Sequence, residues 1–165
     1  MRRIIIGLVI GGILGGVGGF GAGIFVYPFW FLSDVATETV ADLDRKTVVA
    51  TGEFIHANPN DPVHYGRGGV TVYEDQGGEQ LVHLEMDFEV GPGPAFHVYL
   101  VDHPEVRARG HVNDSKFVDL GRLKAFKGSQ TYTVPHGLSA LDYASVVIWC
   151  KEFGVLISPA AIARA

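Results

Sequence analysis

The stretch LVHLEMDF, residues 81–88, decides the fold class that this chain predicts. Apolar and polar side chains alternate along it, with Val82, Leu84, Met86 and Phe88 on one side and His83, Glu85 and Asp87 on the other. Because successive side chains of a β-strand point to opposite faces, the alternation predicts a strand with one buried face.

The same period of two recurs on both sides of this stretch. It is clearest at 96–100, and further short strands are expected at 47–55, 70–74, 117–120, 130–134, 145–150 and 155–157. Turn-forming residues separate them at 58–62, 76–78, 91–94 and 135–137, and only 138–144 suggests a helical turn. Many short strands divided by turns predict an all-β domain, either an antiparallel β-sandwich or a barrel-like sheet.

The N-terminal part of the chain has a different character. Residues 4–32 carry no charge, and residues 4–26 as a helix would be about 34 Å long, enough for a hydrocarbon layer of about 30 Å. Aromatic residues gather where this helix would leave a bilayer: Phe25, Tyr27, Phe29, Trp30 and Phe31. Arg2 and Arg3 precede the span, so the positive-inside rule predicts a cytoplasmic N-terminus and a domain on the far side, in the periplasm if the cell is bacterial.

A cleaved signal peptide is the alternative to this uncleaved signal-anchor. Its apolar region usually runs about 7 to 15 residues and ends at a small-x-small cleavage site. The apolar run here is longer, and Asp34 would stand three residues before a scissile bond after Ala36. We therefore expect one anchor over residues 1–33, a polar linker over 34–46 and one β domain over 47–165.

Glycines repeat at every fourth position of the anchor, at Gly7, Gly11, Gly15, Gly19 and Gly23. On a helix this spacing makes one smooth face that lets a second backbone approach closely. It predicts self-association or docking to another membrane protein, with a glycine-rich anchor that has no protein partner as the alternative.

The charge of the domain argues against one class of partner, and the cysteine count excludes a disulfide within the chain. The chain carries a net charge of -5, and beyond Leu32 it has 11 basic and 18 acidic residues. This acidic domain would repel phosphate, which argues against a nucleic-acid partner. Cys150 is the single cysteine, so no disulfide within the chain supports the fold. The partners we expect are the lipid bilayer and a membrane or envelope protein.

From about Thr51 onward the motifs resemble the DM-thirteen domain, a family described as an electron-transfer domain. The matching pieces are GEF at 52–54, His64 followed by GVTV at 69–72, Leu81 with FEV at 88–90, GP at 93–94 leading into VYL at 98–100, FVDLGRLK at 117–124, GSQTY at 128–132, and VVIWCKEF at 146–153 with Ala160 beyond. The resemblance implies a β-sandwich-like fold, an extracytoplasmic setting and a redox role built around a near-invariant cysteine. Ala95 departs from it, because an acidic residue commonly follows the Gly-Pro pair in the family.

Cys150 and its neighbour Trp149 are the redox candidates. The residues before Cys150 are apolar on both alternations, which predicts a central strand covered on both faces. Burial among apolar groups raises a thiol pKa and lowers its reactivity, so the residues around Cys150 favour a structural thiol over a redox role. One cysteine also cannot cycle through an internal disulfide, so a redox use requires a partner thiol, a sulfenic acid or a bound metal.

Histidines are the other candidate ligands. His83 and His97 lie on the polar sides of two strands; if these strands are neighbours, a cross-strand pair could bind a metal, and His64 is a third candidate. No spacing matches a zinc-protease, zinc-finger or covalent haem motif. Haem held by two histidines needs no motif, so haem or a metal stays open and the cofactor is unknown.

Two functions follow from these features. The first is an accessory electron-transfer or redox-sensing module tethered near a membrane partner. The second is a non-catalytic binding module of the cell envelope, with Cys150 as a core residue and recognition through loops 59–67 and 103–113. The sequence contains no nucleophile elbow, P-loop or dinucleotide fingerprint, so an enzyme is not expected.

Overall fold

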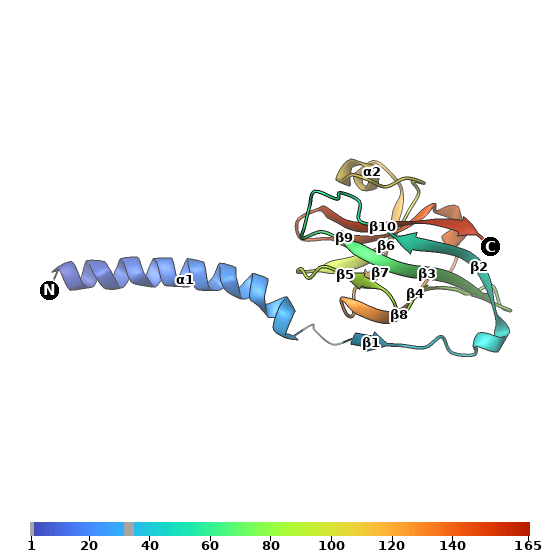
Figure 1. The fold of residues 1–165 in the computed structure, drawn as a ribbon, viewed down its shortest axis with the longest axis horizontal. Coiled ribbons are helices and arrows are strands. Elements are labelled where there is room, and N and C mark those ends of the chain that lie inside the picture. The colour runs from blue at the N-terminus through green and yellow to red at the C-terminus, as the bar shows by residue number, and fades with distance from the viewer. Residues whose placement is uncertain (1, 32–34) are drawn as a thin grey trace.

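The computed structural model describes residues 2–31 and 35–165, and its domain is all-β as predicted. The elements follow the chain in this order: α1 (Arg2–Phe31), β1 (Val35–Thr37), η1 (Leu43–Arg45), β2 (Lys46–Phe54), β3 (Gly66–Asp75), β4 (Gln80–Leu84), β5 (Glu89–Val90), β6 (Phe96–Val101), α2 (Arg109–Asn113), β7 (Phe117–Arg122), β8 (Lys127–Thr133), η2 (Ala140–Asp142), β9 (Ser145–Cys150) and β10 (Val155–Arg164). Figure 1 shows the long helix α1 to one side of the β domain.

Helix α1 contains the stretch that we expected to span a membrane. Ile5–Ile24 is 20 residues long with a mean hydropathy of 2.0, and it is the one helix in the described residues long and apolar enough to cross a bilayer. A signal sequence near the N-terminus would share these properties. The side chains of 25–31, which hold the expected aromatic cluster, lie outside the described part of the structure, as do residues 32–34.

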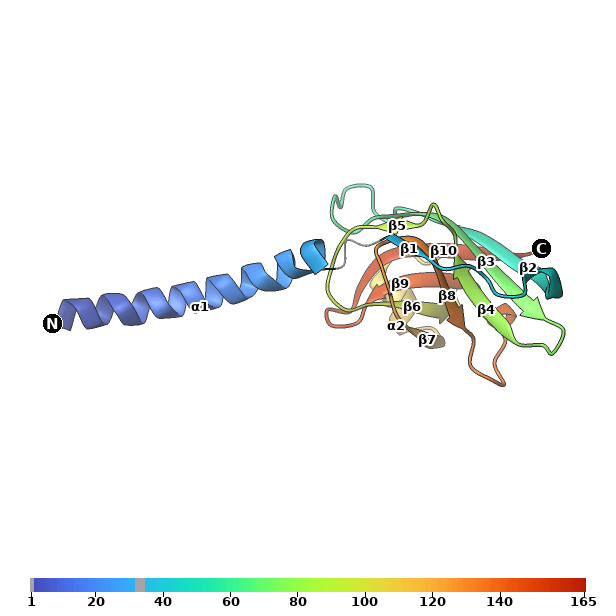
Figure 2. The same ribbon diagram turned by 90° about the horizontal axis from the view of Figure 1, so that it is seen from below.

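The strands form one continuous, strongly curved sheet (Figures 1 and 2). Its order is β1-β8-β4-β3-β2-β10-β9-β6-β7, and the short β5 pairs with both β3 and β8. All pairs are antiparallel except β1 with β8. The sheet rolls around one apolar core, to which almost every long strand contributes alternate side chains.

One predicted strand divides in two. The alternation at 82–88 predicts a single strand, but β4 ends at Leu84 and the chain turns, with the Phe88 N–H donating to the Glu85 carbonyl at 2.9 Å. The turn passes against Gly68, whose φ of 99° favours glycine and where a Cβ would lie 2.5 Å from the Phe88 backbone. Phe88 therefore reaches the core from the turn, and Met86 is exposed instead of buried.

The segment expected as a polar linker at 34–46 contacts the domain. Within it β1 pairs in parallel with β8, and the Glu38 N–H donates to the Ser129 carbonyl at 3.0 Å. The Glu38 carboxylate in turn accepts hydrogen bonds from Lys124 Nζ and from the Thr131 N–H. These contacts fix the start of the domain along the outside of β8.

Strand β9 is buried along its whole length, which confirms the prediction that it is covered on both faces. One face points into the main core, and the other packs in a second cluster with Val106 and Val112 of the α2 region. Trp149 and Cys150 are consecutive residues, so they lie on opposite faces of β9. This alternation separates the two redox candidates.

Candidate functional site

Cys150 is the last residue of β9 and belongs to the main core. Its side chain is 3% exposed, and its Sγ–H donates a hydrogen bond to the Pro94 carbonyl at 3.2 Å. Burial raises the pKa of the Cys150 thiol, although the backbone N–H groups of Phe153 and Glu152 act in the opposite direction. The thiol is therefore protonated and held in a fixed direction at neutral pH.

Cys150 lines a cavity of about 790 Å³ at one end of the rolled sheet. The wall comes from three loops and the strand ends beside them: Asp61, Pro62, Val63, His64, Tyr65, Pro92, Gly93, Pro94, Phe96, Cys150, Phe153 and Val155. Its size lies within the range of about 300–1,000 Å³ that is typical of small-molecule sites. Most of these side chains are apolar, so the cavity suits an apolar ligand.

The local sequence explains this apolar wall. Pro62, Pro92 and Pro94 have no N–H, so these loop positions offer a ligand no backbone donor. At Gly93 a Cβ would lie 2.4 Å from the Phe96 ring, so only glycine lets the loop pack this closely. Ala95 follows with a φ of 51°, and its carbonyl accepts the Lys151 N–H at 3.1 Å. This backbone hydrogen bond between Lys151 and Ala95 connects the 91–95 loop to the turn after β9.

His64 and Asp61 are the polar pair of the cavity wall. The carboxylate can only accept a hydrogen bond, so Nδ1–H of His64 donates to Oδ2 of Asp61, at 2.7 Å. Oδ1 of Asp61 accepts from the N–H groups of Val63 and His64 at 2.9 and 3.1 Å. The hydrogen bond from the His64 side chain is the main cause that lowers the pKa of Asp61 to about 2. Among the described residues, no hydrogen-bond partner occupies Nε2 of His64.

The other two histidine candidates lie elsewhere. The condition for a metal pair of His83 and His97 is not met: β4 lies between β8 and β3, whereas β6 lies between β9 and β7. His83 hydrogen-bonds with Thr131 at 3.1 Å, and burial lowers its pKa. His97 is 2.9 Å from Asp119. Neither lines the cavity, and the described residues hold no group of three or more His, Cys, Asp and Glu side chains suited to a metal ion.

Trp149 is also absent from the cavity lining. It packs under the α2 region with Tyr99, their ring centroids 6.4 Å apart. Of the predicted redox and ligand residues of the domain, the structure therefore brings together Cys150 and His64 only. Asp61 and the 91–95 loop were not predicted as parts of this site, although the alternation and the Pro and Gly residues predict turns there.

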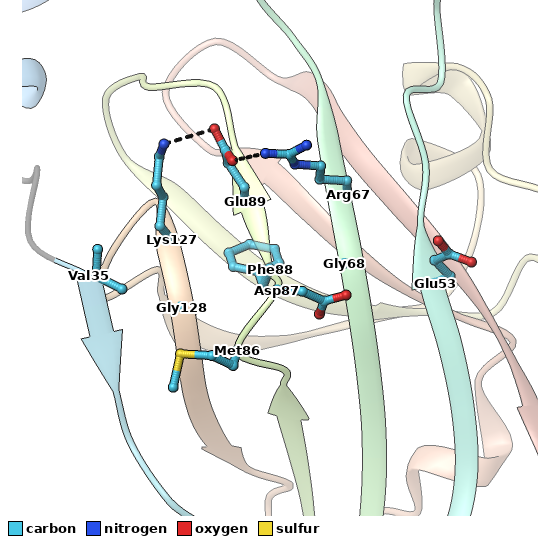
Figure 3. Close-up of a pocket in the computed structure, with 10 residues that line it drawn as sticks. All are labelled: Val35, Glu53, Arg67, Gly68, Met86, Asp87, Phe88, Glu89, Lys127 and Gly128. Carbon is cyan, nitrogen blue, oxygen red and sulfur yellow. Dashed lines mark hydrogen bonds and ion pairs between the residues drawn. The ribbon is translucent and has the colours of Figure 1, made fainter.

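A second, more polar hollow of about 480 Å³ lies next to the start of β1 (Figure 3). Glu89 of β5 lies between two basic side chains there, with Arg67 Nη2 at 2.5 Å and Lys127 Nζ at 3.0 Å. The hydrogen bond from Arg67 and then that from Lys127 lower the pKa of Glu89. This triad links β3, β5 and β8, and Glu89 also accepts a hydrogen bond from the hydroxyl of Tyr65, at 3.4 Å.

Tyr65 lines the apolar cavity, so the triad contacts the wall of that cavity through the hydrogen bond from Tyr65 to Glu89. Its charges are paired, and the remaining polar side chains of the hollow, Glu53 and Asp87, are acidic. Paired charges beside two carboxylates do not form a site for an anion. We assign the hollow a structural role and regard the apolar cavity with Cys150 as the candidate functional site.

The fold and the site together define an all-β domain with one buried thiol in the wall of an apolar cavity. Comparison with known families names the class: the family model described as electron transfer DM13 matches residues 60–162. The match covers more than half of the chain, so this protein belongs to the electron transfer DM13 family and its domain is redox-related. Neither the curated proteins nor the solved structures gave a match.

Proposed function

We propose that this protein is a single-pass membrane protein that holds an electron-transfer module outside the cytoplasm, in the periplasm if the cell is bacterial. The apolar helix Ile5–Ile24 serves as the uncleaved anchor. Arg2 and Arg3 before it favour a cytoplasmic N-terminus. Membership of an electron-transfer family supports the redox function of the domain.

The observation that carries the proposal is the position of Cys150 in the wall of a cavity that also contains His64. The thiol is protonated and is the single cysteine of the chain, so it does not form an internal disulfide. The electron is therefore carried by a group bound in the cavity, and Cys150 and His64 contact that group. We propose a bound organic redox group, because the donor set is too sparse for a metal ion alone.

The test is the ultraviolet and visible absorption spectrum of the full-length protein purified from its native membrane, first oxidised and then reduced with dithionite. A bound organic redox group gives a band that changes on reduction, whereas a Soret band would show haem and would overturn the organic assignment. Cys150→Ala and His64→Ala should shift or remove the band, whereas His136→Ala should not, because His136 is an exposed residue of the turn after β8. A spectrum with no bound group and no reducible band would contradict the proposal.

A binding module of the cell envelope is the second candidate function. The observation that favours it is the burial of Cys150, whose pKa is raised and whose side chain belongs to the core. In this case the cavity holds a ligand that is not redox-active, and Cys150 fills space. Such a module would retain its ligand in Cys150→Ala and would show the same spectrum before and after reduction.

A further inference from the structure

The cavity lies at the end of the domain from which the chain leads to α1. Val35 follows Phe31 by four residues, so their Cα atoms are at most about 14 Å apart. Val35 pairs with Lys127 of β8, Lys127 with Glu89 of β5, and the neighbouring Val90 with Gly66 of β3. Strands lie about 4.8 Å apart, so this path reaches the cavity loops within about 15 Å of Val35.

The topology brings every loop of the cavity to this end. The C-terminal ends of β2 and β9 and the N-terminal ends of β3, β6 and β10 all lie at this end of the domain. In Figures 1 and 2 the loop before β3 and the turn between β9 and β10 both lie on the side of the domain that faces α1. If α1 spans a bilayer, as proposed above, the mouth of the cavity is held next to the membrane surface.

Exposed apolar side chains gather at the same end. Phe153 is 61% exposed and Val63 is 55% exposed, and both line the cavity. Met86 and Val35, 59% and 54% exposed, lie beside the neighbouring hollow. Apolar groups of this kind partition into the interfacial region of a bilayer. The mouth of the cavity is therefore compatible with lipid.

We propose that the cavity takes its ligand directly from the bilayer, and that the ligand is a lipid-soluble quinone in its quinone or quinol form. This inference rests on the proposed membrane anchor and on the electron-transfer function, and it identifies the organic redox group that the cavity binds. Only binding is proposed, with no covalent bond to the protein.

The pair of His64 and Asp61 favours a ligand whose polar head group is uncharged. Asp61 holds Nδ1–H of His64, so Nε2 of the neutral ring accepts a hydrogen bond from a quinol hydroxyl. In the charged ring the same Nε2–H donates to a quinone carbonyl. The ionised Asp61 repels a phosphate or carboxylate, which disfavours phospholipids and fatty acids at this place.

The rest of the wall suits a flat ring with an apolar tail. Phe96, Tyr65 and Phe153 supply aromatic faces and edges for a ring, and the prolines keep donors away from the tail. At about 790 Å³ the cavity has room for a substituted ring and the first part of the tail, and the rest of the tail would stay in lipid. The Sγ–H of Cys150 already donates to Pro94, so this wall adds no charge.

The experiment uses the full-length protein in phospholipid nanodiscs, titrated with a decyl-substituted benzoquinone. Binding is measured by equilibrium partition, and co-purified lipids are identified by mass spectrometry. We expect saturable binding that His64→Ala and Phe153→Asp each weaken about tenfold, because the first variant loses one hydrogen bond to the ligand and the second loses an apolar side chain at the cavity wall. Leu138→Asp is the matched control, because Leu138 is an exposed apolar residue of the turn after β8.

The outcomes distinguish failure of the quinone proposal from failure of the electron-transfer proposal. Absence of saturable binding, or binding that both site variants leave unchanged, overturns the quinone. A phospholipid that occupies the cavity and is displaced by neither quinone nor quinol also overturns it. If the absorption spectrum shows haem or another redox group while quinone does not bind, electron transfer stands and the quinone fails. If neither a redox band nor quinone is found, both proposals fail together.

Discussion

Nδ1 of His64 and Oδ2 of Asp61 lie 2.7 Å apart in the wall of the cavity that also contains Cys150. The pair is formed within one loop, whereas the thiol comes from the end of β9. The Asp61 carboxylate also accepts two backbone N–H groups of its own loop, so the histidine ring is held in one orientation. This arrangement directs Nε2 of His64 away from Asp61 and leaves it for a ligand.

The first prediction concerns the titration of this pair. His64→Ala removes the largest cause of the lowered Asp61 pKa, so the carboxyl should titrate closer to its ordinary value of 3.8 instead of about 2. Because the folded pKa is below the unfolded value, the stabilisation is present above about pH 4 and is lost as pH falls towards 2. Carboxyl NMR titration checks this, and an unchanged Asp61 midpoint in His64→Ala would contradict it.

The second prediction concerns the reactivity of Cys150. Burial raises its pKa, so alkylation of the folded chain near neutral pH should be at least about tenfold slower than alkylation of the chain unfolded in urea. The neutral thiol is favoured by folding, so this contribution to stability is full below the unfolded pKa and declines as pH rises above it. Cys150→Ala combined with Leu138→Cys supplies an exposed thiol as control, and this thiol should react as fast in the folded chain as in the unfolded one.

The sequence predicts strand faces well because alternation is a local property. The alternation at 96–100 and the apolar run before Cys150 gave the right faces of β6 and β9, since each side chain depends only on its own strand. Strand neighbours are a different matter. His83 and His97 could bind one metal only on neighbouring strands, but alternation contains no information on sheet order, and the curved sheet places other strands between them.

The candidate site was predictable in part only. Cys150 and His64 were both identified as candidates, yet nothing local indicated that they share a cavity. Their proximity arises when the loops before β3 and β6 and the turn after β9 meet at one end of the sheet. Helix α2 and strand β1 were missed for a similar reason, because each is short and is stabilised by contacts to distant segments.

The third prediction concerns the fully buried Gln130. Its side-chain oxygen accepts hydrogen bonds from the N–H groups of Lys124 and Ala125 and from the hydroxyl of Tyr132, and its Nε2 donates to the Ala125 carbonyl. Gln130→Ala leaves these groups without partners and should lower the free energy of unfolding by about 3 kcal/mol. Tyr132→Phe removes the hydroxyl that donates to Gln130 and accepts from the Lys124 N–H, and it should cost about 1 kcal/mol in the same urea titration. Equal losses in the two variants would show that the Gln130 network does not act as proposed.

The fourth prediction concerns the glycine face of α1. No other side chain or neighbouring segment lies within 4 Å of a Cβ placed at Gly11 or Gly15, so larger residues there fit the monomer. If a second helix packs on this face, Gly11→Leu with Gly15→Leu should weaken self-association in bilayers about tenfold, because close approach of the two backbones is lost. Energy transfer between labelled chains measures this, with Val17→Leu as control. A wild-type anchor that stays monomeric would show that this face does not drive self-association.

The last prediction concerns the topology on which the bilayer-facing cavity depends. Fused after Ala165, an alkaline phosphatase reporter should be active, because it folds only outside the cytoplasm, and a green fluorescent reporter at the same position should be dark. Replacement of both arginines before the helix, Arg2→Glu with Arg3→Glu, should reduce the phosphatase activity. The positive charge on the cytoplasmic side of the helix is then lost and replaced by negative charge. Mass spectrometry of the membrane fraction should find the N-terminus intact, whereas a cleaved signal peptide would release the domain. Release would leave the cavity loops with no fixed relation to the bilayer, and the apolar residues Val63 and Phe153 would then face water.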